Sequence, residues 1–357
     1  MSGMKLFFKA ILSFTGPIIL EGGNMITIAV DAMGGDNAPE SSVKGALAAA
    51  KEWDNIAITL VGDERKIRKF MDADIPSVRI RHTEEMILSD DEPVRAVRRK
   101  KDASMVIAGK MVKDGEADAM ISAGNTGALM ATGLLIIGRV KGVERPGLAP
   151  LLPTNDGEGV LAVDLGSNMD ATPNHLLQYA IMGSMYRKAV DGIESPRVGL
   201  LNVGTEMMKG NELTKAAYSL LEQAPIHFVG NVEARDVMHR ECDVLVCDGF
   251  AGNIMLKAME GTAGVIMSAL KEEFMRTLIT KMAGAVLRPG LNNFRQKVDY
   301  REHGGAQLLG INGVCIKGHG SSDANAMKNA VRQAKVVAEM AKKHRLFAAI
   351  SDEFSRK

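Results

Sequence analysis

Short apolar runs alternate along the chain with longer segments in which apolar positions recur at helical spacing. Most of the runs lack alternation of polar and apolar residues, which predicts strands buried on both faces. The predicted strands are residues 26–31, 56–62, 117–122, 159–166, 197–204, 226–230, 243–249 and 313–318. The predicted helices are residues 41–53, 90–112, 126–138, 174–188, 212–223, 250–279 and 321–345. This order indicates the α/β class, with a mostly parallel sheet in α/β/α layers.

Several predicted strands end in turns that are rich in glycine or contain aspartate. The turns read "VDAMGGDNAP", "ISAGNTG", "VDLGSN", "NVGTEMMKGNE", "CDGFAGN" and "IKGHGSSD". Any one of them is typical of an ordinary tight connection. In a parallel sheet, however, ligands bind where strands end and helices begin, so the repeated placement predicts one crevice lined by loops.

The turn "ISAGNTG" has the chemistry of a small anion site. Its glycines leave backbone N–H groups accessible, and Asn125 or Thr126 can cap the helix that follows. The alternative is a plain capped helix. The turn matches neither GxGxxG nor GxxxxGK[ST], so a nucleotide is not favoured and inorganic phosphate fits better. Phosphate and substrate binding are assigned to Asp31, Gly34, Gly35, Ser122, Gly124, Asn125, Thr126, Gly127, Asn168, Asp170, Thr205, Asn211 and Asp248.

Three further side chains are candidates for catalysis. Lys209 lies in a glycine-bounded loop and can serve as a point charge for phosphate or a developing anion. Asn253 can donate to an oxyanion or merely cap a helix. His319 lies between two glycines, where we expect a structural and ligand-facing role, with Ser321 or Ser322 capping the last long helix.

Two segments carry clustered basic residues. Residues 91–105 combine an acidic helix start with Arg95, Arg98 and Arg99, a pattern that is usual for a solvated helix face and that can also dock an acidic macromolecule. The segment with Arg139, Lys141 and Arg145 is equally basic. The formal net charge of the chain is only +1, so its overall charge gives no support for nucleic-acid binding.

Composition places the chain among globular proteins. Its 357 residues are 46% hydrophobic and 24% charged, enough for a large core. The three cysteines form no disulfide or zinc pattern, and no aspartate cluster has Mg²⁺ spacing, which favours a reducing cytoplasm and no metal. No apolar run approaches the ~18 residues that span a bilayer.

Residues 1–24 superficially resemble a signal peptide. Lys9 and Pro17 interrupt the apolar stretch, and no small-residue cleavage site follows it. Met25 then opens a clean predicted strand. We therefore expect Met25 to be the natural start and residues 1–24 to be a non-native extension.

Residues 276–294 form an amphipathic pattern. Leu278, Met282 and Val286 recur at four-residue steps, and Ile279 and Leu287 widen the same stripe. A break at Pro289–Gly290 is expected to turn the helix back on itself. Periodicity alone favours core packing or a dimer contact for this stripe.

Taken together, the motifs resemble a known family. The stretches "VDAMGGDNAP", "DEPVRAVRRKKDASM", "ISAGNTGALM", "GRVKGVERPGLAP", "GSNMDATPNHLLQYAIMG", "NVGTE", "KGNELTK", "FVGNVEARD", "CDGFAGN" and "GGAQLLGINGVCIKGHGSSDANA" are similar to the bacterial phosphate acyltransferase of phospholipid synthesis, from Met25 almost to the C-terminus. The departures are mild: "GSNMD" stands where "GANVD" is usual, and "TEMMKGN" replaces charged residues ahead of Lys209.

The resemblance implies transfer of an acyl group from acyl-acyl carrier protein to inorganic phosphate, without a cofactor. It implies a fold similar to phosphotransacetylases and to the isocitrate and isopropylmalate dehydrogenases. Residues 25–357 would form a single domain, with a protruding hairpin at about 270–300. The family's functional lysine and asparagine fall on Lys209 and Asn253.

The resemblance also implies partners and a location. Acyl carrier protein would dock on Arg95, Arg98 and Arg99, and the protein would be a homodimer. The stripe at 278–287 would contact the inner face of the membrane peripherally. Rival functions are a phosphotransacetylase that uses acyl-CoA, a decarboxylating dehydrogenase that needs NAD and a divalent metal, and a non-enzymatic membrane scaffold.

Overall fold

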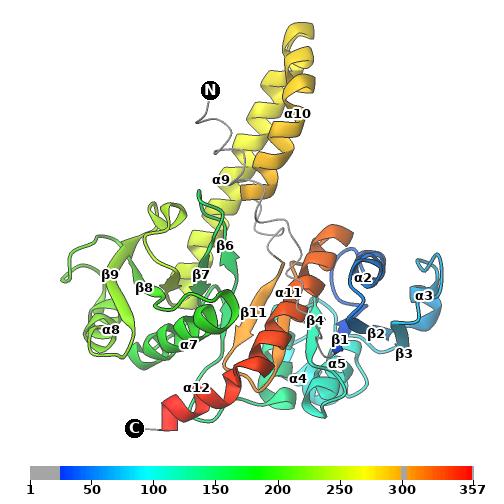
Figure 1. Cartoon of the computed structure of the whole chain (residues 1–357), viewed down its shortest axis with the longest axis horizontal. Helices are drawn as coiled ribbons and strands as arrows, with labels where there is room; N and C mark the ends of the chain where they lie inside the picture. The colour runs from blue at the N-terminus through cyan, green and yellow to red at the C-terminus, as the bar shows by residue number, and fades with distance from the viewer. Residues whose placement is uncertain (1–24, 299–303, 356–357) are drawn as a thin grey trace, which may run out of the picture.

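Two sheets form the centre of the molecule (Figure 1). The computed structural model describes residues 25–298 and 304–355. A seven-stranded sheet has the order β3-β2-β1-β4-β12-β11-β5, and a five-stranded sheet has the order β6-β7-β10-β8-β9. The strands are β1 (Ile26–Asp31), β2 (Ile56–Gly62), β3 (Val78–His82), β4 (Ala119–Ser122), β5 (Gly147–Ala149), β6 (Leu151–Leu152), β7 (Val160–Val163), β8 (Arg197–Asn202), β9 (His227–Glu233), β10 (Val244–Val246), β11 (Ala306–Leu309) and β12 (Val314–Lys317).

Most strand pairs are parallel. Strands β3, β2, β1, β4 and β12 are parallel neighbours, as are β7, β10, β8 and β9. Antiparallel pairs join β11 to β12, β11 to β5, and β6 to β7. The predicted α/β class with a mostly parallel arrangement is confirmed, and the strands are divided between two sheets.

Helices cover both faces of the sheets. They are α2 (Glu40–Glu52), α3 (Glu64–Arg68), α4 (Pro93–Arg99), α5 (Ser104–Lys113), α6 (Thr126–Thr132), α7 (Pro173–Asp191), α8 (Glu212–Glu222), α9 (Gly249–Met275), α10 (Leu278–Val298), α11 (Ala324–Lys343) and α12 (Leu346–Ser355). A π-helical turn, Gly133–Ile137, continues α6, and a 3-10 turn, Val237–His239, precedes β10.

Successive residues of each buried strand point to opposite faces, and this alternation builds the layers. In β1, Ile28 and Val30 pack with α2 and α11, whereas Ala29 packs with α4, α5 and α6. In the five-stranded sheet, Val163 packs with α7 and α8, and Ala162 packs towards α9. The first of these clusters contains residues of both sheets, so one continuous apolar core joins them.

Several short elements lie outside the predicted segments. Strand β3 alternates polar and apolar residues at the sheet edge, and β5, β6 and β11 have at most four residues. The predicted helix 90–112 is divided into α4 and α5, because Lys100 has a non-helical backbone and its ammonium contacts Asp91 and the carbonyl of Met86. Strands this short carry too little periodicity to be recognised from sequence.

Helices α9 and α10 form a hairpin that projects away from the two sheets (Figure 1). The predicted break at Pro289–Gly290 is wrong, since Pro289 lies inside α10 and the chain reverses at residues 276–277. Thr277 sets that reversal: its hydroxyl accepts from the N–H of Thr280 at 3.1 Å, and its N–H donates to the Thr280 hydroxyl at 3.0 Å. Reciprocal bonds of this kind start a helix.

The N-terminal residues 1–24, expected to be a non-native extension, lie outside the described residues. That expectation stays a prediction.

Candidate active site

Three parallel strands of the seven-stranded sheet end side by side. Asp31 ends β1, Ser122 ends β4 and Lys317 ends β12. The loops that follow contain residues 31–37, 122–127 and 317–323, and we call them together the glycine junction. A crevice at the carboxyl ends of parallel strands is where ligands bind in such sheets.

Glycines allow the three loops of the junction to touch. A Cβ atom on Gly34 would lie 2.6 Å from Asp31 Oδ2 and 2.7 Å from the backbone nitrogen of Gly124. A Cβ atom on Gly35, which has φ +107°, would lie 3.0 Å from Ala123 Cβ and 3.2 Å from the Gly320 carbonyl oxygen. The first and second loops therefore meet at Gly34, and all three meet at Gly35, with no room for a side chain at either position.

Asp31 fixes the base of the junction. It is 2% exposed and accepts hydrogen bonds of 2.6 Å from the hydroxyls of Ser104 and Ser122. Ser122 Oγ in turn accepts from the N–H of Gly124 at 3.1 Å. Burial raises the pKa of Asp31, although these hydrogen bonds favour its ionised form. The structure gives Asp31 a role in holding the turn, and its contact with a ligand stays a prediction.

Asn125 caps α6 and ties down a neighbouring loop. Its Oδ1 accepts from the N–H of Ala128 at 3.0 Å, and its Nδ2 donates to the Ser89 carbonyl at 3.1 Å. Of the two expected caps, Asn125 and Thr126, the structure selects Asn125. A Cβ on Gly127 would lie 2.6 Å from Pro93 Cγ, so the first turn of α6 packs directly against the start of α4.

The third loop of the junction carries His319. Its Nδ1 lies 2.8 Å from Ser321 Oγ and accepts from the Ser321 N–H at 3.2 Å, which leaves the proton of a neutral ring on Nε2. Asn37 Nδ2 donates to the carbonyls of Ser321 and Ser322 at 3.2 Å each, joining the first loop to the third. The expected cap by Ser321 or Ser322 is wrong: Asp323 caps α11, because its carboxylate accepts from Ala326 N–H at 2.9 Å.

A second group of candidate residues lies at the carboxyl edge of the five-stranded sheet. Asp164, directly after β7, is fully buried and accepts from the N–H groups of Leu148 at 2.9 Å and Asn168 at 2.7 Å. Burial raises the pKa of Asp164. The Asn168 amide donates to the Pro146 carbonyl at 2.7 Å and to Tyr179 Oη at 2.8 Å. Asn168 therefore anchors its own loop.

Asn253 is not a helix cap. Asp248 caps α9, accepting from the N–H groups of Phe250 at 3.0 Å and Ala251 at 2.9 Å. Asn253 lies half-buried one turn further on, where a Cβ on Gly166 would be 3.5 Å from its Cγ. Within residues 25–298 and 304–355 its amide forms no hydrogen bond, so the group is available to a ligand.

Lys209 lies on an exposed loop whose backbone is held at both ends. Asn202 Nδ2 donates to the Lys209 carbonyl at 3.1 Å, and Asn231 Nδ2 donates to the Glu206 carbonyl at 2.9 Å. Asn211 caps α8 through the N–H of Thr214 at 2.9 Å. The Lys209 side chain forms no ion pair in the described part of the chain.

The predicted site residues thus fall into two groups, one for each sheet. The contacts described above lie within each group, and none of them joins one group to the other. The glycine junction holds Asp31, Gly34, Gly35, Ser122, Gly124, Asn125, Thr126, Gly127 and His319. The edge of the five-stranded sheet holds Asn168, Asp170, Thr205, Lys209, Asn211, Asp248 and Asn253, of which Asp170 and Thr205 are exposed.

Sequence reasoning missed Lys317. It is 9% exposed, and its ammonium donates to the carbonyls of Ala123, at 3.4 Å, and Gly318. Burial lowers the pKa of Lys317 to about 8. A lysine that ends the apolar run "GVCIK" is the available sequence signal, because Lys is almost never fully buried without a partner.

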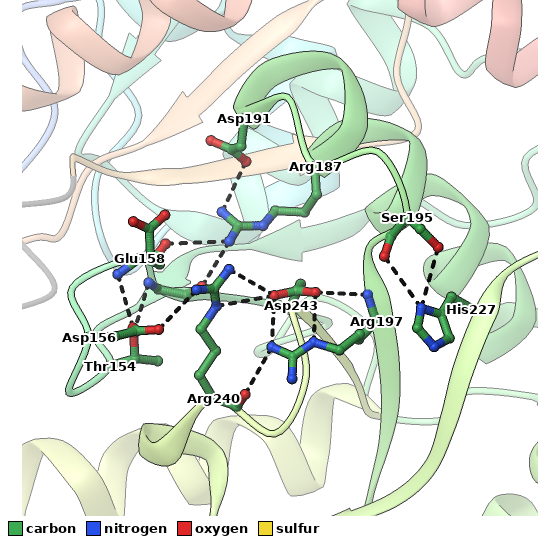
Figure 2. Close-up of polar contacts among 11 residues, drawn as sticks. Thr154, Asp156, Glu158, Arg187, Asp191, Ser195, Arg197, His227, Arg240 and Asp243 are labelled. Atoms are coloured by element: carbon green, nitrogen blue, oxygen red, sulfur yellow. Dashed lines mark hydrogen bonds and ion pairs between the residues drawn. The ribbon is translucent and has the colours of Figure 1, made fainter.

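The opposite, amino-terminal edge of the five-stranded sheet carries a charged network (Figure 2). Arg197 Nε lies 3.1 Å and Arg240 Nη2 3.0 Å from the Asp243 carboxylate, and Arg240 Nη1 lies 2.9 Å from Asp156. Burial opposes the charge on Asp243, but the hydrogen bonds and charge of Arg197 outweigh it and lower its pKa. The charges satisfy one another, which indicates a structural role for this edge.

The basic helix α4 adjoins the glycine junction. Arg95, Arg98 and Arg99 are exposed, and none forms an ion pair within the part of the chain that the structure describes. Because Pro93 packs against Gly127, this basic surface begins beside the second loop of the junction.

Cysteine nucleophiles are disfavoured at the site. Cys242, Cys247 and Cys315 are buried, and burial raises the pKa of all three thiols, to about 12 for Cys242 and Cys315. A thiol that stays protonated is a poor nucleophile.

No grouping of three or more His, Cys, Asp or Glu side chains suited to a metal ion lies among the described residues. None of the helices in the described ranges is long and apolar enough to cross a bilayer.

Comparison with known proteins identifies close relatives. The family model for the fatty acid synthesis protein matches residues 26–345. A phosphate acyltransferase from Brevibacillus brevis is 59% identical over 305 residues, covering 85% of this chain and 91% of the relative. A phosphate acyltransferase from Bacillus cereus is 56% identical over 308 residues, covering 86% of this chain and 93% of the relative.

Solved structures share the fold at low sequence identity. A phosphotransacetylase from Streptococcus pyogenes has a TM-score of 0.59 at 18% identity, covering 96% of this chain and 100% of that one. The EutD phosphotransacetylase from Staphylococcus aureus has a TM-score of 0.56 at 16% identity, covering 89% of this chain and 94% of that one. The likeness to phosphotransacetylases in fold is confirmed.

Proposed function

The chain belongs to the fatty acid synthesis protein family, and from this premise we propose that it transfers a fatty acyl group from acyl-acyl carrier protein to inorganic phosphate. The product is acyl phosphate for phosphatidic acid and phospholipid synthesis. The names of the relatives support acyl transfer to phosphate. The observation that carries the proposal is the glycine junction, where three glycine-containing loops meet at the carboxyl ends of parallel strands.

Phosphate itself serves as the nucleophile. It is anionic at neutral pH, so the reaction needs no acyl-enzyme, in keeping with the buried cysteines. One phosphate oxygen attacks the thioester carbonyl, the tetrahedral intermediate collapses, and the carbon–sulfur bond breaks to release the carrier-protein thiolate. The protein has to hold phosphate beside the carbonyl and stabilise the developing charge.

Each candidate residue has one role in the proposed reaction. Backbone N–H groups of residues 123–127, with Lys209, hold phosphate. Asn253 donates to the oxyanion, a role supported by an amide that forms no hydrogen bond with any residue in the described ranges. His319 donates a hydrogen bond from Nε2 to the departing sulfur, which leaves as the thiolate, since Nδ1 accepts from Ser321. The two sheet edges would then flank the thioester from opposite sides.

Carrier-protein docking is assigned to Arg95, Arg98 and Arg99. An acidic carrier would be steered to this exposed face, which begins beside Gly127 and so beside the proposed acceptor site. The alternative donor is acyl-CoA, as in a phosphotransacetylase.

Membrane contact is assigned to the hairpin of α9 and α10. Leu278 and Val286 are each 80% exposed, and Ile279, Met282 and Leu287 are exposed beside them, so the stripe is not packed in the core of this chain. A peripheral enzyme gains from keeping an apolar product at the lipid interface on the cytoplasmic face of the membrane. Formation of a homodimer is part of the same proposal.

Hydroxylamine trapping tests the function. The purified protein is incubated with long-chain acyl-acyl carrier protein, with and without phosphate, and acyl hydroxamate is measured after subtraction of the direct reaction of hydroxylamine with the thioester. The same assay is run with acyl-CoA. We expect a phosphate-dependent increment with the carrier-protein donor. An equal increment with acyl-CoA would overturn the choice of donor, and no increment with either would overturn the function.

A further inference from the structure

A row of polar side chains crosses three strands at the base of the glycine junction. Lys317 and Ser122 are register partners on β12 and β4, and Asp31 follows the pair of Val30 with Ile121 on β1 and β4. All three side chains lie at the carboxyl end of their strands. The row therefore faces the loops that we assign to phosphate.

The row lies on one face of the sheet. Ala29, Met120 and Cys315, two residues earlier on the same strands, pack together in the cluster beneath α4, α5 and α6. Since side chains alternate along a strand, Asp31 and Lys317 point to that same face. Lys317 is thus buried under the second loop, as its contact with the Ala123 carbonyl requires.

An unpaired ammonium is costly to bury, and among the described residues no carboxylate lies within ion-pair distance of Lys317, since the charges of Asp36 and Asp31 act from further away. An ammonium group has three N–H donors. The carbonyls of Ala123 and Gly318 take two, and over residues 25–298 and 304–355 no further acceptor and no ion-pair partner contacts Lys317. Buried charges are normally paired or hold a ligand. The third N–H donor of Lys317 therefore suits an anion as its acceptor.

Resting on the proposed function, we propose that Lys317 is a phosphate-binding residue, whose buried ammonium contacts the acceptor phosphate in the glycine junction. Its bonds to Ala123 and Gly318 hold the second and third loops together, and its remaining N–H donates to a phosphate oxygen. The ligand is inorganic phosphate, and the residue contributes to its affinity.

The charge of Lys317 is sensitive to pH in an accessible range. Burial lowers its pKa to about 8, while the nearby charges of Asp36 and Asp31 act in the opposite direction. Only the ammonium form binds phosphate in this proposal. Phosphate affinity should therefore be full below about pH 8 and should decline above it, as the ammonium loses its proton. Phosphate itself is already mostly a dianion above about pH 8, so its own charge does not cause this decline.

Kinetics of variants test the proposal. Lys317→Met should raise the KM for phosphate about tenfold to a hundredfold, because one charged hydrogen bond is lost, and should leave the KM for the thioester unchanged. In the wild type, the KM for phosphate should rise between about pH 8 and about pH 9.5, whereas Lys317→Arg should lose this rise, since arginine stays charged. Lys51→Met is the control, because Lys51 is exposed in the last turn of α2, and it should keep the wild-type KM for phosphate.

The outcomes separate the two proposals. If the wild type shows no phosphate-dependent transfer, the proposed function fails. If the wild type is active and Lys317→Met keeps the wild-type KM for phosphate, only the role of Lys317 fails. If Lys317→Met does not fold, the wild-type profile decides, because a KM for phosphate that stays constant up to about pH 9.5 overturns the inference.

Discussion

Replacing Gly34 by alanine tests the geometry of the junction with a single methyl group. The new Cβ would lie 2.6 Å from Asp31 Oδ2, 2.7 Å from Gly124 N and 2.9 Å from Ser122 Oγ. Gly34 does not have a positive φ, so the perturbation is steric rather than conformational. Asp31 is held by two serines and Gly124 contributes backbone, so the first and second loops have to move apart.

The expected magnitude follows from overpacking. Forcing a methyl group into a packed site costs about 1–3 kcal/mol of unfolding free energy. In domains of about 150–250 residues, each kcal/mol of lost unfolding free energy lowers the melting temperature by about 2–4 °C, and the shift should be smaller in this longer chain. Because Gly124 belongs to the proposed phosphate site, the KM for phosphate should rise while the KM for the thioester changes little.

Thermal denaturation and steady-state kinetics measure both effects. Gly261→Ala is the matched control: it lies inside α9 with nothing within 4 Å of the added Cβ. It should gain about 0.5–1 kcal/mol of helix stability and keep wild-type kinetics. A Gly34→Ala variant with the melting temperature and phosphate kinetics of the wild type would refute the close approach of the loops and its role in binding.

Three other substitutions probe the remaining assignments. Asn253→Ala should lower kcat roughly 10²-fold or more, measured by hydroxamate formation; a change confined to melting temperature would remove Asn253 from the reaction. Arg98→Glu with Arg99→Glu should raise the KM for the carrier-protein thioester and weaken its salt dependence, and unchanged kinetics would move docking elsewhere. Leu278→Glu with Val286→Glu should abolish liposome flotation and spare activity on soluble substrate, whereas loss of the dimer would make the stripe structural.

The local pattern of apolar residues was sufficient to predict the strands that are buried on both faces. The predicted bounds of β1 and β2 agree with the structure, because each is a mostly apolar run closed by a turn. The convergence of β1, β4 and β12 also followed from the rule that parallel strands end at one edge. Division into two sheets did not follow, since it depends on which distant strands pair.

Two features were predicted at the wrong residues, the cap of α11 and the reversal before α10. In both, a neighbouring polar side chain formed the hydrogen bonds that fix the helix start. Asp323, one residue beyond the expected serines, is the residue whose carboxylate caps α11. The reciprocal hydrogen bonds between Thr277 and Thr280 start α10. The chain therefore reverses at residues 276–277, well before Pro289. Such choices depend on backbone geometry that composition does not reveal. Lys317 was missed for a related reason, because a lysine at the end of an apolar run does not by itself show that loops from elsewhere in the chain will bury its ammonium.

A crystal structure of the wild-type protein with inorganic phosphate tests the central claim most directly. The account predicts phosphate density in the glycine junction, within hydrogen-bond distance of Lys317 and of backbone N–H groups between Ala123 and Gly127. Phosphate bound elsewhere on a protein that is active in the hydroxamate assay, with the junction empty, would contradict the account.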